Sequence, residues 1–104
     1  MAFDIDEVRF PHLVEAKIRG RRIAEDEVYE ALTAAGDPGE EEPLTIRRVA
    51  GLRGGDGFWV LCRVPSSGRY LSVGFEVMPN GLAWCYHAME MTQTQRRQFQ
   101  RRRR

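Results

Sequence analysis

The chain has 104 residues with 42% apolar side chains, which is enough for one domain over residues 1–104 around a modest core. It contains no apolar run long enough to cross a membrane and no basic targeting segment, so we expect a cytoplasmic protein. The charge is divided, because residues 1–42 carry 12 acidic and 5 basic side chains and residues 43–104 carry 3 acidic and 11 basic. The basic half suits nucleic acid or an acidic protein partner, although a solvated tail at residues 101–104 explains part of the excess.

The N-terminal segment predicts a weak strand and a helix. Residues 3–10 alternate in apolarity with a slip in phase, which supports at most a short edge strand. Pro11 suits the first turn of a helix, where its missing N–H costs nothing, and Gly20 suits the helix end. The expected buried face of this helix consists of Val14 and Ile18.

A second helix is predicted from Glu25, because three consecutive acidic residues suit the positive end of the helix dipole. Gly36 is the expected end of this helix. The short link at residues 21–24 makes the two helices an αα-hairpin. The buried stripe of the second helix is expected to comprise Val28, Ala31, Leu32 and Ala35.

Four strands are predicted in the second half of the chain, and the links between them are short enough to require antiparallel pairing. The best-patterned strand is residues 70–77, in which apolar and polar side chains alternate. It is followed by Asn80-Gly81, a strong signal for a tight hairpin because both residues tolerate positive φ. The predicted strands cover residues 44–50, 58–64, 70–77 and 82–88.

A last helix is predicted after Thr92, which with Gln95 matches a capping box. Basic residues follow it and complement the negative end of the helix dipole. The sequence therefore predicts an α+β fold with two N-terminal helices, a four-stranded antiparallel β-meander and a C-terminal helix. The helices are expected to pack on one face of the sheet.

The two cysteines, Cys62 and Cys85, lie in apolar runs and are expected to be buried free thiols in a reducing compartment. Cys85 and His87 are two residues apart, which places both on one face of a regular strand. A zinc site would need further ligands, and only Cys62 and His12 could supply them. We therefore expect neither a metal ion nor another cofactor.

The sequence lacks a Walker loop, an HExxH motif and a nucleophile elbow. Its scattered basic groups fit metal-independent RNA cleavage, in which a base activates the 2′-OH, cations stabilise the phosphorane and an acid protonates the leaving oxygen. Any one of these residues taken singly is more often structural. The candidate catalytic groups are His12, Lys17, Arg69 and His87. The candidate RNA-binding groups are Arg21, Arg22, Arg47, Arg96 and Arg97.

Three segments of the chain resemble BrnT-type toxins, ribonucleases of type II toxin–antitoxin systems with a RelE-like α+β fold. HLVEAKIRGRRIAEDEVYEAL, residues 12–32, is similar to the family's lysine-bearing first helix and its EEV helix. GRYLSVGFEV, residues 68–77, is similar to the GRYLLVVF strand. AMEMTQTQRRQF, residues 88–99, is similar to the closing AR-x-MT-x-x-ERRRY. The order of the three segments, which with their spacing cover most of the chain, carries the resemblance.

The resemblance implies that Lys17 matches the helix lysine and that Arg69 matches the arginine of the GRYL strand. Arg96 and Arg97 match the closing basic pair. Three family positions carry other residues in this chain. The arginine of the AR motif falls on Met89, the arginine of the preceding strand falls on Trp84, and the histidine of the family's HGIS motif falls on Arg21. Methionine and tryptophan cannot neutralise phosphate charge, so the resemblance implies the fold more strongly than the activity.

Two functions follow. The first is the toxin component of a type II toxin–antitoxin system, a metal-independent ribonuclease or RNA-binding protein whose cleavage activity is retained or lost. Its family partner is a small DNA-binding antitoxin. The second is a catalytically inactive toxin-fold module for protein interaction, with a homodimer among its partners and no membrane contact. The apolar patch for this second function would consist of Trp84, Met89 and Met91, for which packing under the last helix is the competing explanation.

Overall fold

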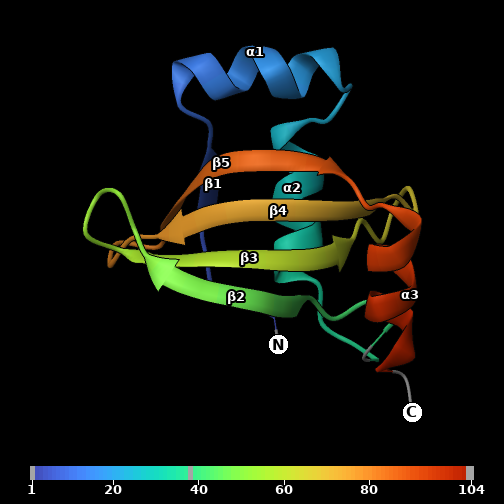
Figure 1. The fold of residues 1–104 in the computed structure, drawn as a ribbon. Helices are drawn as coiled ribbons and strands as arrows, with labels where there is room; N and C mark the ends of the chain where they lie inside the picture. The colour runs from blue at the N-terminus through green and yellow to red at the C-terminus, as the bar shows by residue number, and fades with distance from the viewer. Residues whose placement is uncertain (1, 38, 103–104) are drawn as a thin grey trace.

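A computed structural model describes residues 2–37 and 39–102, which form an α+β fold with three helices and one five-stranded mixed sheet (Figure 1). The strand order across the sheet is β1-β5-β4-β3-β2. In chain order the elements are β1 (Glu7–Arg9), α1 (His12–Gly20), α2 (Glu25–Thr33), β2 (Leu44–Ala50), β3 (Asp56–Arg63), β4 (Tyr70–Val77), β5 (Leu82–Glu90) and α3 (Gln93–Arg101). No helix in this described part is long and apolar enough to cross a membrane.

The α+β class is confirmed, but the predicted four-stranded antiparallel sheet is wrong, because β1 adds a fifth strand before the two helices. β1 pairs in parallel with β5, with Val8 opposite Ala83. The N–H of Asp6 also donates to the carbonyl of Gly81 at 2.9 Å. A strand of three residues is too short for its own alternation to predict it. Its partner lies at the other end of the sequence, so no local turn signals the pairing.

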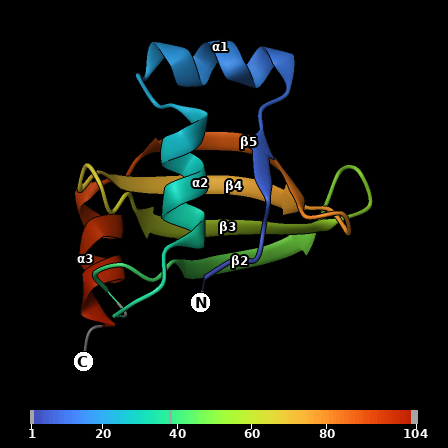
Figure 2. The same ribbon diagram turned by 180° about the vertical axis from the view of Figure 1, so that it is seen from behind.

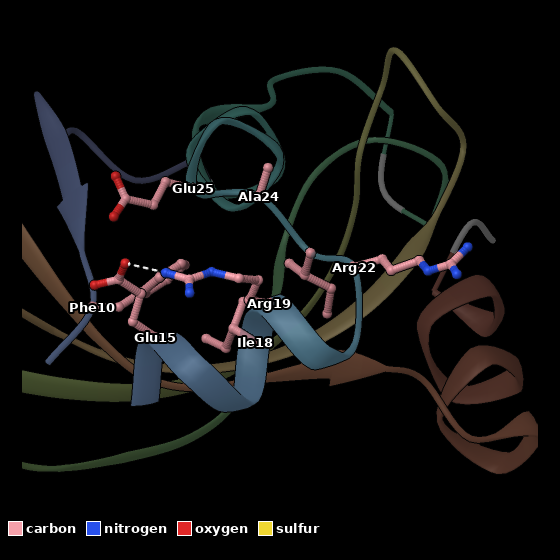
Figure 3. A pocket seen from close by; sticks show the side chains of 8 residues that line it. Phe10, Glu15, Ile18, Arg19, Arg22, Ala24 and Glu25 are labelled. Carbon is pink, nitrogen blue, oxygen red and sulfur yellow. Dashed lines mark hydrogen bonds and ion pairs between the residues drawn. The ribbon is translucent and has the colours of Figure 1, made fainter. Parts of the chain in front are cut away.

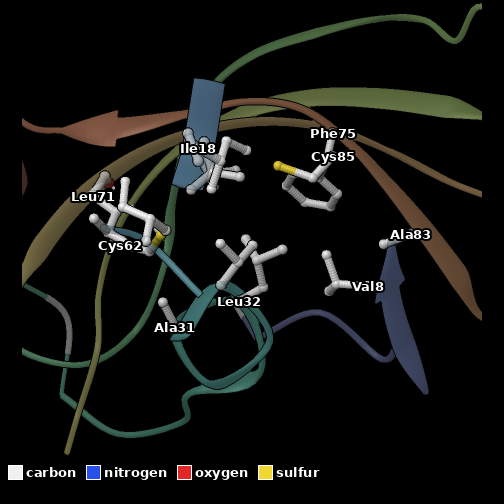
Figure 4. Close-up of a cluster of buried hydrophobic side chains, with 14 of the residues drawn as sticks. Val8, Ile18, Ala31, Leu32, Cys62, Leu71, Phe75, Ala83 and Cys85 are labelled. Atoms are coloured by element: carbon white, nitrogen blue, oxygen red, sulfur yellow. Dashed lines mark hydrogen bonds between the residues drawn. The ribbon is translucent and has the colours of Figure 1, made fainter. Parts of the chain in front are cut away.

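The main core lies between the sheet and α2, which crosses one face of it (Figure 2). Side chains from β1, both N-terminal helices and the central strands meet there (Figure 4). Three of the four predicted stripe residues of α2 are fully buried: Val28, Ala31 and Leu32. Ala35 is exposed, which corrects the fourth, because α2 ends at Thr33 and Ala34 already has an extended backbone.

The predicted hairpin between β4 and β5 is confirmed, with one correction to its turn. The N–H of Gly81 donates to the carbonyl of Met78 at 3.1 Å, and the N–H of Met78 donates to that of Leu82 at 2.8 Å. Gly81 has a φ of 85°, whereas the φ of Asn80 is not positive. A turn of ordinary hand followed by one left-handed glycine therefore joins the strands. The side chain of Asn80 accepts the N–H of Leu82 at 3.1 Å.

The last helix, α3, begins as predicted at the capping box of Thr92 and Gln95. It packs at the end of the sheet through Phe99, which is fully buried and has its ring edge-on to Tyr70 with centroids 6.0 Å apart. The guanidinium of Arg102 donates to the carbonyl of Pro43 at 2.9 Å and lies over the Phe99 ring. α3 therefore lies at the end of the sheet and not on the face that α2 covers (Figure 2), which corrects the expectation that all the helices pack on one face. Residues 103 and 104 of the arginine tail lie outside the described residues.

Candidate functional site

The face of the sheet opposite α2, seen in Figure 1, is crossed by a row of four residues from four strands. Arg47 of β2 is paired with Trp59 of β3, Trp59 with Gly74 of β4, and Gly74 with His87 of β5. We call this the open face, and define it by these four residues together with Glu76 and Trp84, which pair with each other one row away. The row spans three strand spacings, about 14 Å.

A β-bulge at Tyr86 places His87 on the open face and corrects its expected alignment with Cys85. The pairing shifts between Gly74 opposite His87 and Phe75 opposite Cys85, so Tyr86 is an extra residue. Cys85 is fully buried on the core side, whereas His87 is exposed. Burial raises the pKa of Cys85 to about 12, so this thiol is protonated near neutral pH.

Two cations lie beside His87: Lys17 of α1, and Arg21, which directly follows the end of α1. The guanidinium of Arg21 donates to the carbonyl of Ala88, the next residue of β5, at 3.0 Å. Although His87 is exposed, partial desolvation by its neighbours lowers its pKa below the ordinary value, and the positive charges of Arg21 and Lys17 lower it further. The fold thus gathers His87, Lys17 and Arg21 at one end of the open face. An imidazole that is neutral at pH 7 can accept a proton there.

Arg69 is engaged in holding the α1–α2 link. Its guanidinium donates to the carbonyl of Arg22 at 2.7 Å and to the carboxylate of Glu27 at 3.0 and 3.2 Å. It also reaches Glu90 at 3.4 Å. Arg22 adopts a left-handed backbone conformation with a φ of 57°, which residues other than glycine rarely adopt. These bonds give Arg69 a structural role that the sequence did not predict.

Replacing Arg69 with alanine should therefore destabilise the fold by about 2 kcal/mol, because a charged hydrogen-bond donor is lost from a site where the Arg69 and Glu27 side chains are 24% and 22% exposed. Urea unfolding at neutral pH measures the loss. Arg69→Lys should recover only part of it, since one ammonium cannot replace the fork of the guanidinium. Equal stability of Arg69→Ala and the native chain would contradict this structural role.

The other candidate residues are dispersed. His12 is exposed at the start of α1, and its side chain forms no hydrogen bond or ion pair with another described residue. The guanidinium of Arg96 lies over the Tyr70 ring, 4.2 Å from its centroid, and Arg97 is exposed on the same helix. Arg47 alone of the five predicted RNA-binding arginines lies in the open-face row. These residues do not converge on His87 as a single site.

Arg22, another candidate, borders a pocket of about 420 Å³ between α1 and α2 (Figure 3). Its charged groups include Glu15 and Arg19, which form an ion pair at 2.7 Å, and Glu25. This pocket is lined by α1 and α2, whereas Arg47, Trp59 and Gly74 line a separate cavity on the open face. The charged pocket and the open face are therefore two separate sites on the molecule.

A buried carboxylate that no sequence pattern singled out lies beside the open-face row. Glu76 is fully buried and accepts the hydroxyl of Tyr86 at 2.7 Å and the N–H groups of Arg53 and Gly55 at 3.0 and 2.6 Å. It thereby fixes the glycine-rich loop after β2. A Cβ on Gly51 or Gly55 would collide with the Glu76 side chain, so the loop needs glycine there. The repeated glycines in this loop were the available sequence signal, but they were interpreted only as a turn.

Stability contributed by Glu76 should fall in acid. Burial raises the pKa of Glu76, but the hydrogen bonds from Tyr86, Gly55 and Arg53 lower it to a net value below the ordinary 4.5. A carboxylate whose pKa is lowered by folding stabilises the fold at pH values above its unfolded-state pKa. That stabilisation is lost as the pH falls through the folded-state pKa. The gap in melting temperature between the native chain and Glu76→Gln should be constant from pH 7 to 5 and shrink below 4.5. A gap independent of pH would contradict this.

Comparisons with protein-family models, curated proteins and solved structures found no match to this chain. The resemblance to BrnT-type toxins therefore stays a prediction. Within residues 2–37 and 39–102, no three His, Cys, Asp or Glu side chains gather as a group that could hold a metal ion. The chemical possibilities of the open face rest on its imidazole, its cations and its aromatic rings.

Proposed function

We propose that this chain is a toxin-like protein that binds single-stranded RNA on the open face and cleaves it without a metal ion at His87. The observation that carries this proposal is the convergence of His87, Lys17 and Arg21 at one end of a basic and aromatic sheet face. Arg47 extends the positive charge to the other end of the row. A polyanion with exposed bases fits a surface that offers cations and aromatic rings together.

His87 would accept the proton of a ribose 2′-OH. The 2′ oxygen then attacks the adjacent phosphorus, the bond to the 5′ oxygen breaks, and a 2′,3′-cyclic phosphate forms. The leaving 5′ oxygen takes a proton from solvent. Lys17 and Arg21 would neutralise the charge that accumulates on the phosphorane oxygens. Arginine retains four further N–H donors after its bond to the carbonyl of Ala88.

The purified protein should convert single-stranded RNA to fragments ending in a 2′,3′-cyclic phosphate in the presence of EDTA. Expression in a host cell should arrest growth and degrade RNA, and co-expression of a cognate DNA-binding antitoxin would relieve the arrest. Absence of both arrest and cleavage would contradict the nuclease proposal. RNA binding that persists without cleavage would reduce the function to RNA binding.

The second candidate function is a protein-interaction module, and exposed apolar side chains favour it. Leu52 and Val49 are 85% and 55% exposed, and Met89 is 37% exposed. Trp84, predicted to be part of the patch, is instead covered by Arg53, whose guanidinium lies 4.0 Å from the ring centroid. Sedimentation of the purified chain should then show a dimer that Leu52→Ser dissociates. A monomer at all concentrations would contradict self-association.

A further inference from the structure

A cavity of about 260 Å³ is sunk into the open face beside the row of Arg47, Trp59, Gly74 and His87. Trp59 and the loop tip at Leu52 contribute to its wall, and Gly74 contributes to its lining within the row. Its accessible surface is mainly apolar, although the sheet around it carries cations. The cavity belongs to the same face as the proposed function, and Arg47, at one charged end of the row, contributes to its lining.

Gly74 leaves this space open, although the backbone at position 74 does not require a glycine. Its φ is not in the left-handed region, and an added Cβ would meet only the Cβ of His87 at an ordinary 3.5 Å. Gly51 and Gly55 differ, because a Cβ on either would collide with Glu76. The strand would therefore accept a larger residue at position 74. Trp59 and His87 flank Gly74 on strands about 10 Å apart, and glycine places no side chain between them.

The aromatic side chains at the cavity are held in place. The indole N–H of Trp59 donates to the hydroxyl of buried Ser72 at 2.6 Å, while 37% of Trp59 stays exposed. The Tyr86 hydroxyl donates to Glu76 and accepts from the Nε of Arg53 at 3.2 Å. A fixed aromatic wall lowers the entropy lost when a flat ligand stacks on it.

The charges around the cavity select an anionic ligand with a flat apolar part. Arg47 lies at one end of the row, and the cations beside His87 lie at the other. The carboxylate that lines the cavity, Glu76, is occupied by three donors. A nucleic acid strand has the matching form, since its phosphates are anionic and every base has a flat face.

We propose that this cavity takes one unpaired nucleobase of a single-stranded RNA, stacked on Trp59 in the space left by Gly74. Arg47 and the cations at His87 contact the phosphates on either side of that base. This inference rests on the proposed RNA binding and adds to it a base-recognition site distinct from the cleaving group. Paired RNA would be excluded, because a base within a duplex cannot enter the cavity.

The test compares a fluorescent RNA octamer with an abasic octamer of the same ribose–phosphate backbone, by fluorescence anisotropy at fixed salt. The native chain should bind the base-bearing octamer roughly 5- to 150-fold more tightly, the range expected for stacking one base. Gly74→Val fills the gap and should abolish this difference while leaving the abasic affinity within about two-fold. Gly20→Val is the matched control, since a Cβ at Gly20 meets nothing within 4 Å and the residue lies off the open face; it should preserve the difference.

Each outcome separates the base site from the proposed function. Equal affinity of the native chain for both octamers overturns the base site and leaves phosphate binding intact. Binding to neither octamer overturns both. Full discrimination by a folded Gly74→Val also overturns the base site; if that variant is misfolded by circular dichroism, Trp59→Leu should abolish discrimination instead. A dimer that Trp59→Leu dissociates, together with absent RNA binding, would assign the cavity to a second copy of the chain.

Discussion

Replacing His87 with alanine should lower the rate of RNA cleavage by on the order of 10²–10⁴-fold, the usual contribution of a positioned general base. The affinity for RNA should change little, because the proposed binding mode assigns the phosphate contacts to Lys17, Arg21 and Arg47. The native rate should rise with pH as His87 loses its proton, with a midpoint below the ordinary 6.5, since desolvation and the neighbouring cations lower the pKa of His87. Single-turnover cleavage assays between pH 4.5 and 8 measure both effects.

Two variants, one just after α1 and one within it, test this prediction further. Arg21→Ala removes a cation beside His87 and should slow cleavage and move the pH at which the rate levels off upward. Arg19→Ala is the matched control, because it removes a cation from α1 itself, where Arg19 is ion-paired with Glu15 in the pocket between α1 and α2. It should leave the pH profile unchanged. An undiminished rate for His87→Ala would remove this residue from the mechanism.

Replacing Phe99 with alanine should destabilise the fold by about 3–5 kcal/mol, the range for deleting a buried aromatic ring. Phe99 is the fully buried side chain of α3, and its ring contacts Tyr70 and the guanidinium of Arg102. The ring is the main apolar anchor of an otherwise polar helix, so α3 should also lose its protection from hydrogen exchange. Urea unfolding and amide exchange measure the two effects.

Two variants bracket the Phe99 result. Phe99→Leu keeps most of the buried volume and should cost roughly 1 kcal/mol. Gln98→Ala changes an exposed neighbour on the same helix and should stay within about 0.5 kcal/mol of the native chain. If Phe99→Ala were no less stable than Gln98→Ala, the packing of α3 against the sheet would be incorrect.

Most of the fold could be predicted from local patterns. Alternation gave β4, the hairpin signal gave its partner β5, and the Thr92 capping box gave the first residue of α3. β1 could not be found in this way, because its three residues pair with a strand at the far end of the chain. The end of α2 was placed too late, since Gly36 marks the following loop rather than the helix terminus.

Less of the candidate site could be predicted, because it depends on contacts across the sheet. The sequence identified His87, Lys17 and Arg21 as polar groups, but only the α1–β5 packing brings them together. The bulge at Tyr86, which turns His87 away from Cys85, has no local signal. Trp59 was seen as one position of an alternating strand. Its place beside Gly74 follows from the strand register, which the sequence does not contain.

The parallel pairing of β1 with β5 also constrains how the chain folds. Glu7 pairs with Leu82, and most of the helices and strands lie between these two residues in the chain. This contact therefore joins residues that are far apart in sequence. Contacts of this kind slow folding, because a long loop loses entropy before the pairing repays it. During synthesis, β1 leaves the ribosome before β5 and cannot form its strand pairing until β5 has emerged. The sheet is therefore completed only after synthesis has passed β5, and the open face is completed with it.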